Sequence, residues 1–413
     1  MRPRRLLAAL AGAGLSLSAA GAQTPLVLDG DPSARLVWTR VFASPGDDWI
    51  NDIVPLGDGR VLAVGFLGRV ESGGDWRALA ATLREDGAVL SAREYGAGGG
   101  IDAFWSVAQG GDGRLAFAGF TTRIGAGGID AFALFTDAAG TVLSERAFGG
   151  GGYDRFTDLA PAGDGYLFLG HSQPAGEDRR RLFAVRTARD GTPLWERIVE
   201  GGDSISPLYI EAAADGGFVV AGGIGRGDDS DLLVMKLDGE GRELWRRTIG
   251  TPAADDVNHG LALLPNGDIV VVGYSRSWGA RDNDILAVTL SPAGEVLRRE
   301  LLGGADDDRP MLAKADARGR VWIVGSSRSA GAGGRDMIVA RLGPDGAFEP
   351  GVLTLGAAGD DTGTAVDPQA DGAILIAGYS DGLGGGGEDA VVARIAAPRW
   401  DRPHPAFRRR AIP

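Results

Sequence analysis

The sequence contains no cysteine and only three histidines and four methionines among its 413 residues. Without cysteine the chain can form no disulfide, zinc–thiolate site, iron–sulfur cluster or thiol nucleophile. Basic residues are also outnumbered, because 42 Lys and Arg stand against 55 Asp and Glu, which gives a net charge of −13. Nucleic acids bind to basic surfaces, so we expect no nucleic-acid partner.

The first 22 residues have the layout of a secretory signal peptide. Three arginines stand among the first five residues, and residues 6–20 form an uncharged run of Leu, Ala, Gly and Ser. Small residues follow at Ala20 and Ala22, the two positions that a signal peptidase reads. A membrane anchor is the alternative, but the run is short for a bilayer. We expect an exported chain, periplasmic or extracellular, that is cleaved before Gln23 and has no later transmembrane segment.

A repeat of about 52 residues fills the remainder of the chain. Its marker is an apolar, strand-like run that ends in glycine, and these glycines recur 51 to 54 residues apart: Gly65, Gly119, Gly170, Gly222, Gly273, Gly325 and Gly378. A turn dipeptide, most often Asp-Gly, precedes each run. Asp-Gly and Asn-Gly are the strongest short hairpin signals, because both turn positions need a positive φ. Seven matches in register indicate a repeat architecture.

Each repeat predicts four short antiparallel strands. The first two flank the Asp-Gly turn, the third follows a Gly-rich loop, and the fourth follows another turn. We interpret an aspartate as opening the third strand in all seven units: Asp75, Asp130, Asp178, Asp231, Asp284, Asp336 and Asp389. Four-stranded units of this length, repeated radially, are typical of a β-propeller. The fold class is therefore all-β, a seven-bladed β-propeller of four-stranded antiparallel blades.

The ends of the chain predict how the ring closes. Residues 36–42 match the pattern of a fourth strand, whereas the seventh unit ends after its third strand. The N-terminal strand should therefore complete the last blade and cover its open edge. This gives four segments: a signal peptide at 1–22, a linker at 23–35, the propeller at 36–398 and a basic, proline-containing tail at 399–413. We expect the tail to be disordered.

The repeats resemble those of secreted bacterial β-propeller repeat proteins. The stretches that carry the resemblance best run from Asp215-Gly216-Gly217 to Gly222 and from Asp231 to Gly241. The resemblance covers nearly the whole mature chain and implies the propeller fold. It implies no reaction, because such propellers serve as binding, adhesion or assembly scaffolds without a shared catalytic set.

A weaker resemblance links the turn before strand four to the tryptophan-docking segment of quinoprotein-type propellers. Tryptophan recurs at this place as Trp38, Trp195 and Trp245. Quinone enzymes of that group usually have eight blades and a vicinal disulfide, which this chain cannot form. We therefore interpret these tryptophans as packing between blades and predict no cofactor.

The repeated aspartates also suggest calcium, which binds six to eight oxygen ligands. The densest groups are residues 306–308 and 359–361. Each loop offers only one or two carboxylates, however, and an aspartate that caps the backbone N–H groups of its own turn explains the same spacing. Calcium is possible, but we favour the capping role.

Ligand-binding residues are more plausible at the channel mouth, where the first strands of the blades differ from one another. The unusual polar residues on these strands are Asn51, Asp52, Asp158, Glu211, Asn258, His259, Arg309 and Lys314. Polar groups solvated by channel water are the alternative interpretation. We take Asp52, Asp158, Glu211, Asn258, His259, Arg309 and Lys314 as the candidate site.

No set of residues for nucleophilic catalysis stands out, since there is no G-x-S-x-G motif and no histidine pair with metal-ligand spacing. We therefore predict an exported, monomeric, non-enzymatic binding or scaffold protein. It would engage a protein or glycan partner through its loop face and channel mouth. The alternative is a secreted polysaccharide hydrolase or lyase that uses carboxylates at the channel mouth, because acidic residues are plentiful.

Overall fold

The computed structural model describes residues 26–69, 75–96, 100–201, 203–226, 229–251, 256–280, 282–383, 387–396 and 398–412, together with the backbone of 16–19. Every regular element in this part of the chain is a β-strand. No helix in the described residues is long and apolar enough to cross a membrane.

The strands form seven blades, each a hydrogen-bonded sheet. Blade one consists of β4 (Asp48–Pro55), β5 (Arg60–Arg69), β6 (Asp75–Arg84) and β7 (Val89–Tyr95), and blade two of β8 (Asp102–Gln109), β9 (Leu115–Thr121), β10 (Asp130–Thr136) and β11 (Val142–Phe148). Blade three consists of β12 (Tyr153–Ala162), β13 (Gly165–Gln173), β14 (Arg181–Ala188) and β15 (Pro193–Val199), and blade four of β16 (Ile205–Ala212), β17 (Phe218–Arg226), β18 (Asp229–Leu237) and β19 (Glu243–Ile249). Blade five consists of β20 (Asp256–Leu263), β21 (Ile269–Ser275), β22 (Asp284–Leu290) and β23 (Val296–Gly303), and blade six of β24 (Asp308–Ala315), β25 (Val321–Ser327), β26 (Asp336–Leu342) and β27 (Phe348–Gly356). Blade seven consists of β28 (Asp361–Pro368), β29 (Ile374–Ser380), β30 (Asp389–Ala396) and β3 (Arg35–Ala43).

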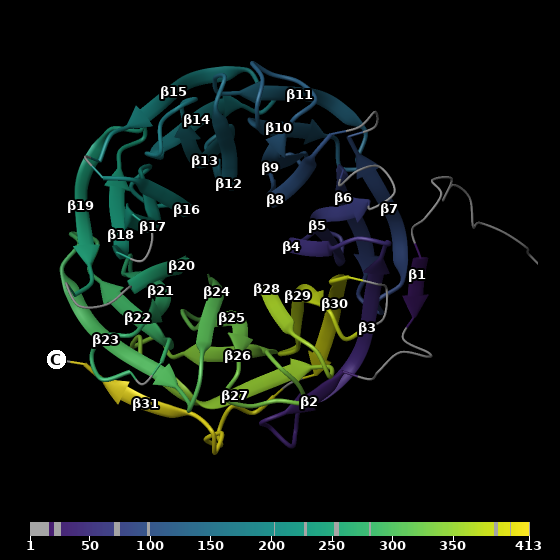
Figure 1. Ribbon diagram of the computed structural model, residues 1–413, viewed down its shortest axis with the longest axis vertical. Coiled ribbons are helices and arrows are strands. Elements are labelled where there is room, and N and C mark those ends of the chain that lie inside the picture. Colours follow the sequence, from purple (N-terminus) through teal and green to yellow (C-terminus); the bar gives the residue numbers. More distant parts are fainter. Residues whose placement is uncertain are drawn as a thin grey trace, which may run out of the picture.

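The blades stand around a central channel like the spokes of a wheel (Figure 1). Strand one of each blade is innermost and strand four lies at the rim. The apolar core is divided among the spaces between neighbouring blades: one cluster joins Ala262 of blade five to Ile323 of blade six, for example. The predicted seven-bladed propeller is confirmed.

The N-terminal strand closes the ring as the sequence predicts. β3 pairs antiparallel with β30, with Leu36 opposite Ile395 and Phe42 opposite Ala390. Blade seven therefore consists of strands from opposite ends of the chain. The backbone of β1 (Ser16–Ala19) adds to the outer edge of β3. β1 lies within the predicted signal peptide, whose cleavage stays a prediction.

The repeated aspartates cap backbone turns, as the sequence suggests. The carboxylate of Asp130 accepts the N–H groups of Ala126 at 3.1 Å and Gly127 at 3.3 Å, and Asp336 does the same for Ala332 and Gly333. Both aspartates are almost completely buried. Their hydrogen bonds satisfy loop N–H groups that the sheet cannot reach.

Glycine accompanies these aspartates because a side chain would collide with them. A Cβ at Gly356, the last residue of strand four of blade six, would lie 2.0 Å from Asp336 Oδ1 and 2.8 Å from Asp361 Oδ2. A Cβ at Gly303 would lie 1.9 Å from Asp284 Oδ1. These distances are far below van der Waals contact, so at these two junctions the aspartate leaves room for glycine only.

Strand three of one blade and strand one of the next form what we call a junction. Asp336 and Asp361 show the arrangement: each opens its strand, and both lie against Gly356. Five junctions carry an aspartate at both positions: Asp389 and Asp48, Asp130 and Asp154, Asp231 and Asp256, Asp284 and Asp308, Asp336 and Asp361.

Two junctions depart from this rule, and here one prediction is wrong. In blade three, Asp178 lies in the loop before β14, and Arg181 takes the position opposite Ser172. In blade one, Asp75 does open β6, but Arg77 occupies the equivalent position, opposite Leu67. The prediction of one aspartate at this place in all seven blades counted the nearest acidic residue and ignored the register.

The three predicted interblade tryptophans pack against turn glycines of the following blade. A Cβ at Gly87 would lie 2.6 Å from the Trp38 ring, and one at Gly241 would lie 2.5 Å from the Trp195 ring. Trp245 approaches Gly294 in the same way. The packing interpretation is confirmed for these residues.

The tail is ordered, so the expectation of disorder is wrong. β31 (Arg408–Ala411) pairs with β23 as a fifth strand of blade five, and β2 (Val27–Asp29) pairs with β27 on blade six. Trp400 and Phe407 are 3% and 5% exposed and join the interblade core. Asp31 Oδ2 accepts the N–H groups of Arg399 at 2.7 Å and Trp400 at 3.1 Å. Apolar anchors and main-chain hydrogen bonds thus dock the tail on the rim.

Candidate functional site

A β-bulge interrupts strand one in every blade at the same height in the channel. The register shifts between Ile50 and Asp52, and likewise at six equivalent places. The extra residues are Asn51, Trp105, Thr157, Leu208, His259, Met311 and Thr364. Bulges redirect side chains and are common beside functional sites. Here they bring seven different side chains to one ring around the channel.

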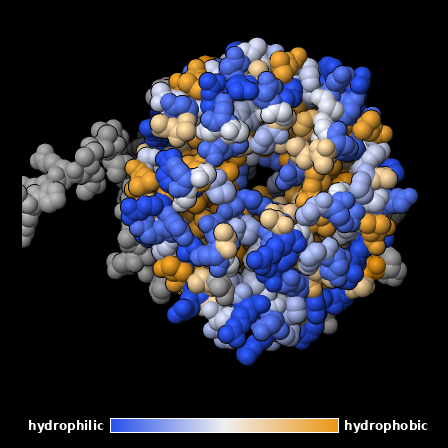
Figure 2. All heavy atoms as spheres, turned by 180° about the vertical axis from the view of Figure 1, so that it is seen from behind, coloured by the Kyte–Doolittle hydropathy of each residue, from blue (hydrophilic) through white to orange (hydrophobic). Residues whose placement is uncertain are grey.

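The channel contains a cavity of about 600 Å³, within the range of small-ligand pockets. Figure 2 shows the surface hollowed at the centre of the ring, with apolar side chains gathered beside the hollow. Among the predicted residues, the cavity wall includes Asp52, Asp158, Glu211, His259 and Lys314. We call the end of the channel at which the seven first strands begin the N-terminal mouth.

Asp52 and Asp158 share one hydroxyl across three blades. Ser106 Oγ lies 3.0 Å from Asp52 Oδ2 and 2.8 Å from Asp158 Oδ1. A hydroxyl has one hydrogen, so one of these two carboxyls must carry a proton. Burial, together with the charges of Asp52 and Glu211, raises the pKa of Asp158 to about 8, which identifies Asp158 as the protonated group.

Backbone amides satisfy both carboxyls further. Asp52 accepts the N–H groups of Ile53 at 2.8 Å and of Val107, in blade two, at 3.0 Å. Asp158 accepts that of Ile210, in blade four, at 2.9 Å. The two groups therefore tie blades one to four together at the bulges, and most of their hydrogen-bonding capacity is used inside the protein.

Glu211 and Lys314 lie toward the other end of the channel. Lys314 forms an ion pair of 2.6 Å with Asp367, which is almost completely buried. Burial raises the pKa of Glu211 to about 7, against the opposing charge of Lys314. No hydrogen bond to the Glu211 carboxyl is found within the described residues, so this group is available to a ligand in the cavity.

His259 of blade five and Arg309 of blade six flank the same aromatic ring. His259 stacks on Tyr274 with 5.4 Å between ring centroids, and the Arg309 guanidinium lies 4.9 Å from the centre of that ring. Arg309 does not line the cavity, because it pairs with Asp307 at 3.0 Å. Burial and the charge of Arg309 lower the pKa of His259 to about 4, so its imidazole is neutral.

Asn258 is placed only by its backbone, opposite Gly273 in the β20–β21 pair. Its side chain lies outside the described part of the structure. Asn51 is buried and donates a hydrogen bond of 2.8 Å from Nδ2 to the carbonyl of Phe104. Asn51 therefore serves contact between blades one and two.

The sequence interpretation missed an arc of aromatic rings at the N-terminal mouth. Successive ring centroids lie 4.4 to 6.5 Å apart in the order Tyr379, Trp49, Phe66, Trp76, Phe120 and Trp105. The arc spans blades seven, one and two. Trp49 and Trp105 line the cavity. The other end of the arc continues to Arg155, whose guanidinium lies 5.3 Å from the centre of the Trp105 ring.

Three rings of the arc come from one position of the repeat, the residue after the repeat glycine in strand two. That position holds Phe66, Phe120, Tyr274 and Tyr379 in blades one, two, five and seven. Opposite Phe66 on strand one stands Trp49. An alignment of the seven repeats would have revealed these rings, because four of the seven blades carry a phenylalanine or tyrosine at this position.

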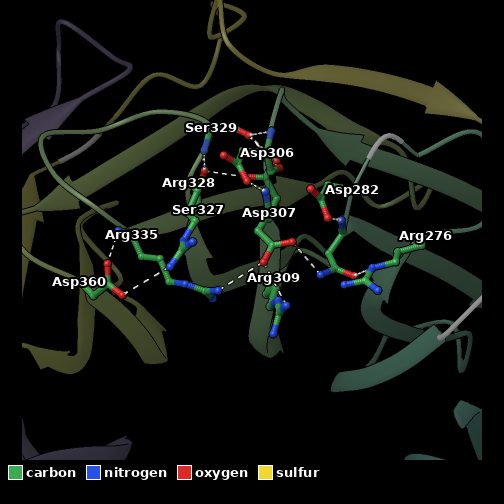
Figure 3. Close-up of polar contacts among 12 residues, drawn as sticks. Arg276, Asp282, Asp306, Asp307, Arg309, Ser327, Arg328, Ser329, Arg335 and Asp360 are labelled. Carbon is green, nitrogen blue, oxygen red and sulfur yellow. Dashed lines mark hydrogen bonds and ion pairs between the residues drawn. The ribbon is translucent and has the colours of Figure 1, made fainter. Parts of the chain in front are cut away.

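The two aspartate groups considered for calcium are bound to arginine. Figure 3 shows Asp307 between Arg309 and Arg335, and Asp360 beside Arg335 and Arg328. Asp307 Oδ2 lies 3.3 Å from Arg335, and Asp360 Oδ2 lies 3.8 Å from Arg328. Within the described residues no three His, Asp or Glu side chains are arranged to hold a metal ion. The absence of a cofactor stays a prediction.

Comparisons with known proteins identify the fold. No family model and no curated protein matches this chain. Among solved structures it is similar to hydrazine synthase of Kuenenia stuttgartiensis, with 13% identity and a TM-score of 0.54 over 80% of this chain and 92% of that one. It is also similar to a puromycin hydrolase (17% identity, TM-score 0.48, 82% of this chain and 51% of that one). A third neighbour is Sqt1 of Chaetomium thermophilum, with 13% identity and a TM-score of 0.46 over 85% of this chain and 83% of that one. At 13% identity, the likeness to hydrazine synthase shows a shared fold and nothing more.

Proposed function

We propose that this chain is a non-enzymatic binding protein that takes a glycan at the N-terminal mouth of its channel. The observation that carries the proposal is the aromatic arc, which reaches the cavity through Trp49 and Trp105. Both rings are only partly buried. Flat aromatic rings pack against the C–H faces of sugar rings, and the hydroxyl groups at the edges of the sugars remain free to form hydrogen bonds.

The arrangement of the arc supports an extended ligand. Phe66 and Phe120 are buried, but the partly exposed rings of Trp49, Trp76, Trp105 and Tyr379 offer more than one stacking position. The cavity below them can hold the end of a glycan chain. The signal-peptide pattern adds a biological setting, because an exported protein meets the polysaccharides of the cell envelope and its surroundings. We propose a periplasmic or extracellular location on that ground.

Direct titration tests the proposal. Mature protein (residues 23–413) is titrated with cellohexaose, maltohexaose and hexagalacturonate by calorimetry. We expect Trp49→Ala and Trp105→Ala to weaken binding of every oligosaccharide that the unchanged protein binds. Trp195→Ala, on the outer rim, is the matched control and should leave affinity unchanged. If no saccharide of the panel binds, the glycan proposal falls and a protein partner becomes the better hypothesis.

One observation favours a second candidate, a polysaccharide hydrolase or lyase. Glu211 faces the cavity with a pKa raised to about 7 by burial, which suits a general acid or base near neutral pH. If the chain is an enzyme, it releases products from a bound polysaccharide and Glu211→Gln abolishes turnover without loss of affinity. Binding without turnover by the unchanged protein excludes this candidate for that polysaccharide.

A further inference from the structure

Resting on the proposed function, we propose that the ligand is an acidic glycan whose sugar carboxylate is bound by Arg155 and Arg180. Arg155 stands on strand one of blade three and lines the cavity. Arg180 lies in the loop immediately before β14. The Arg155 guanidinium lies at the end of the aromatic arc, 5.3 Å from the centre of the Trp105 ring, where a sugar stacked on Trp105 would present its substituents.

Neither guanidinium is neutralised by the protein. Within the described residues, no carboxylate forms an ion pair with Arg155 or Arg180. The arginines that neighbour Arg180 behave differently: Arg179 pairs with Glu200 at 2.9 Å, and Arg181 pairs with Glu177 at 2.6 Å. In a chain with more acidic than basic residues, two unneutralised arginines together point to an external anion.

Strand register places the two arginines on either side of β13: Arg155 pairs with His171, and Arg181, which follows Arg180, pairs with Ser172. Burial is the main cause of the lowered pKa of Arg155, and the positive charge of Arg180 lowers it further. Both charges also lower the pKa of the buried His171 to about 2, after the larger effect of burial. His171 stacks beneath Tyr153 with 5.4 Å between ring centroids. The imidazole is therefore neutral and adds no competing charge.

The junction between blades three and four has lost both of its acidic residues. Arg181 replaces the aspartate of strand three. Ile205 replaces the aspartate of strand one, which in the other six blades is the first or second residue of that strand. Main-chain hydrogen bonds fix Arg180 here, since its carbonyl accepts the N–H of Ile205 at 2.9 Å. Its own N–H donates to Ser204 Oγ at 3.1 Å. No aspartate remains at this junction to compete with a ligand carboxylate.

The blade that follows leaves space at the same height. Where blades one, two, five and seven carry a phenylalanine or tyrosine after the repeat glycine of strand two, blade four carries Gly223. A Cβ built there would meet no atom closer than 3.9 Å. Opposite Gly223 stands Ser206. A guanidinium pair beside small residues, next to an aromatic ring, has the shape and the charge that a uronic acid requires.

The test compares hexagalacturonate with its fully methyl-esterified form, which keeps the sugar rings and lacks the charge. We expect the unchanged protein to bind the acid at least about tenfold more tightly, since charged hydrogen bonds are the stronger class. Arg155→Gln and Arg180→Gln should each reduce this preference to less than threefold, roughly the limit of a neutral contact. Arg155→Lys should retain part of the preference. Arg197→Gln, on the outer strand β15, is the matched control.

The outcomes separate this inference from the proposed function. If Trp105→Ala weakens binding of both forms but Arg155→Gln and Arg180→Gln leave the preference for the acid intact, the charge assignment is wrong and glycan binding stands. Equal affinity of the unchanged protein for both forms has the same meaning. If neither form binds and the neutral oligosaccharides also fail, both proposals fall. Thermal melts of each variant exclude loss of folding as the cause.

Discussion

The junction between blades six and seven and the junction between blades three and four are built from the same repeat and have opposite chemistry. The first buries Asp336 and Asp361 against one glycine. The second places Arg181 and Ile205 at the same positions, with Arg180 beside them. The aspartate pair recurs at five junctions, four of which have a glycine at this position and one of which has Ala43, and it serves the fold. The second occurs at one place and leaves charge uncompensated, so departure from the repeat marks the surface at which we propose that the ligand binds.

The acidic junctions predict that the protein is most stable below neutral pH, the largest effect we expect. Burial, with the charge of Asp389 adding to it, raises the pKa of Asp48 to about 7, and burial raises those of Asp308 and Asp361 to about 6. A raised folded-state pKa means that the folded chain binds the proton more tightly than the unfolded chain. Stability is thus complete below about pH 4 and is lost as pH rises through 6 to 7, at about 1.4 kcal/mol per pH unit for each carboxyl.

Thermal melts at pH 5 and pH 8 check this expectation. We expect the melting temperature to be roughly 10 °C lower at pH 8. Asp308→Asn, which mimics the protonated form, should flatten the dependence, whereas the exposed Asp112→Asn should leave it unchanged. A melting temperature that rises from pH 5 to pH 8 would contradict the assignment of protons to the junctions.

Gly356, at the junction between blades six and seven, should be intolerant of any side chain. Gly356→Ala places a Cβ against both Asp336 and Asp361, so we expect a loss of about 1–3 kcal/mol in the free energy of unfolding, the usual cost of overpacking. Denaturant titration measures it. Gly57→Ala is the control, because a Cβ there meets nothing within 4 Å. Equal stability of the two variants would refute the pairing of glycine with aspartate.

Converting an exceptional junction back to the repeat gives the smallest and sharpest test. Arg77 and Asp102 both lie against Gly96 at the junction between blades one and two. Arg77→Asp therefore places a second carboxylate beside that of Asp102. Arg181→Asp creates no such pair, because Ile205 stands opposite. We expect Arg77→Asp to increase the loss of stability between pH 5 and pH 8 by about 1 kcal/mol and Arg181→Asp to leave that loss unchanged. An identical pH dependence of the two variants would show that the junction partner is irrelevant.

The repeat made most of the fold predictable from the sequence. Asp-Gly turns fix the hairpins, the glycine spacing fixes seven blades, and the unmatched strand at 36–42 fixes the closure. The turns and the glycine spacing are local signals that recur in every blade. The tail was mispredicted because its prolines and arginines outweighed Trp400 and Phe407 in the interpretation, although these two apolar residues are what dock it.

The candidate site was less predictable because it depends on what lies across the channel. Asp52 and Asp158 are recognisable as unusual, but that they share Ser106 follows only from the geometry of three blades. Arg155 was passed over because one arginine on a strand is unremarkable in sequence. Its significance comes from the missing aspartates around Arg180, and an absence at one position becomes visible only when the register is known.

The way in which the two ends of the chain are attached determines how the molecule would respond to a pull. β2 and β31 are held by three- and four-residue pairings on the rim, whereas β3 is clamped along seven paired residues inside blade seven. Tension applied to the ends would peel the short rim strands one hydrogen bond at a time, and the ring would yield only when β3 is sheared as a whole. A protein tethered by its termini would thus release slack before it lost its channel.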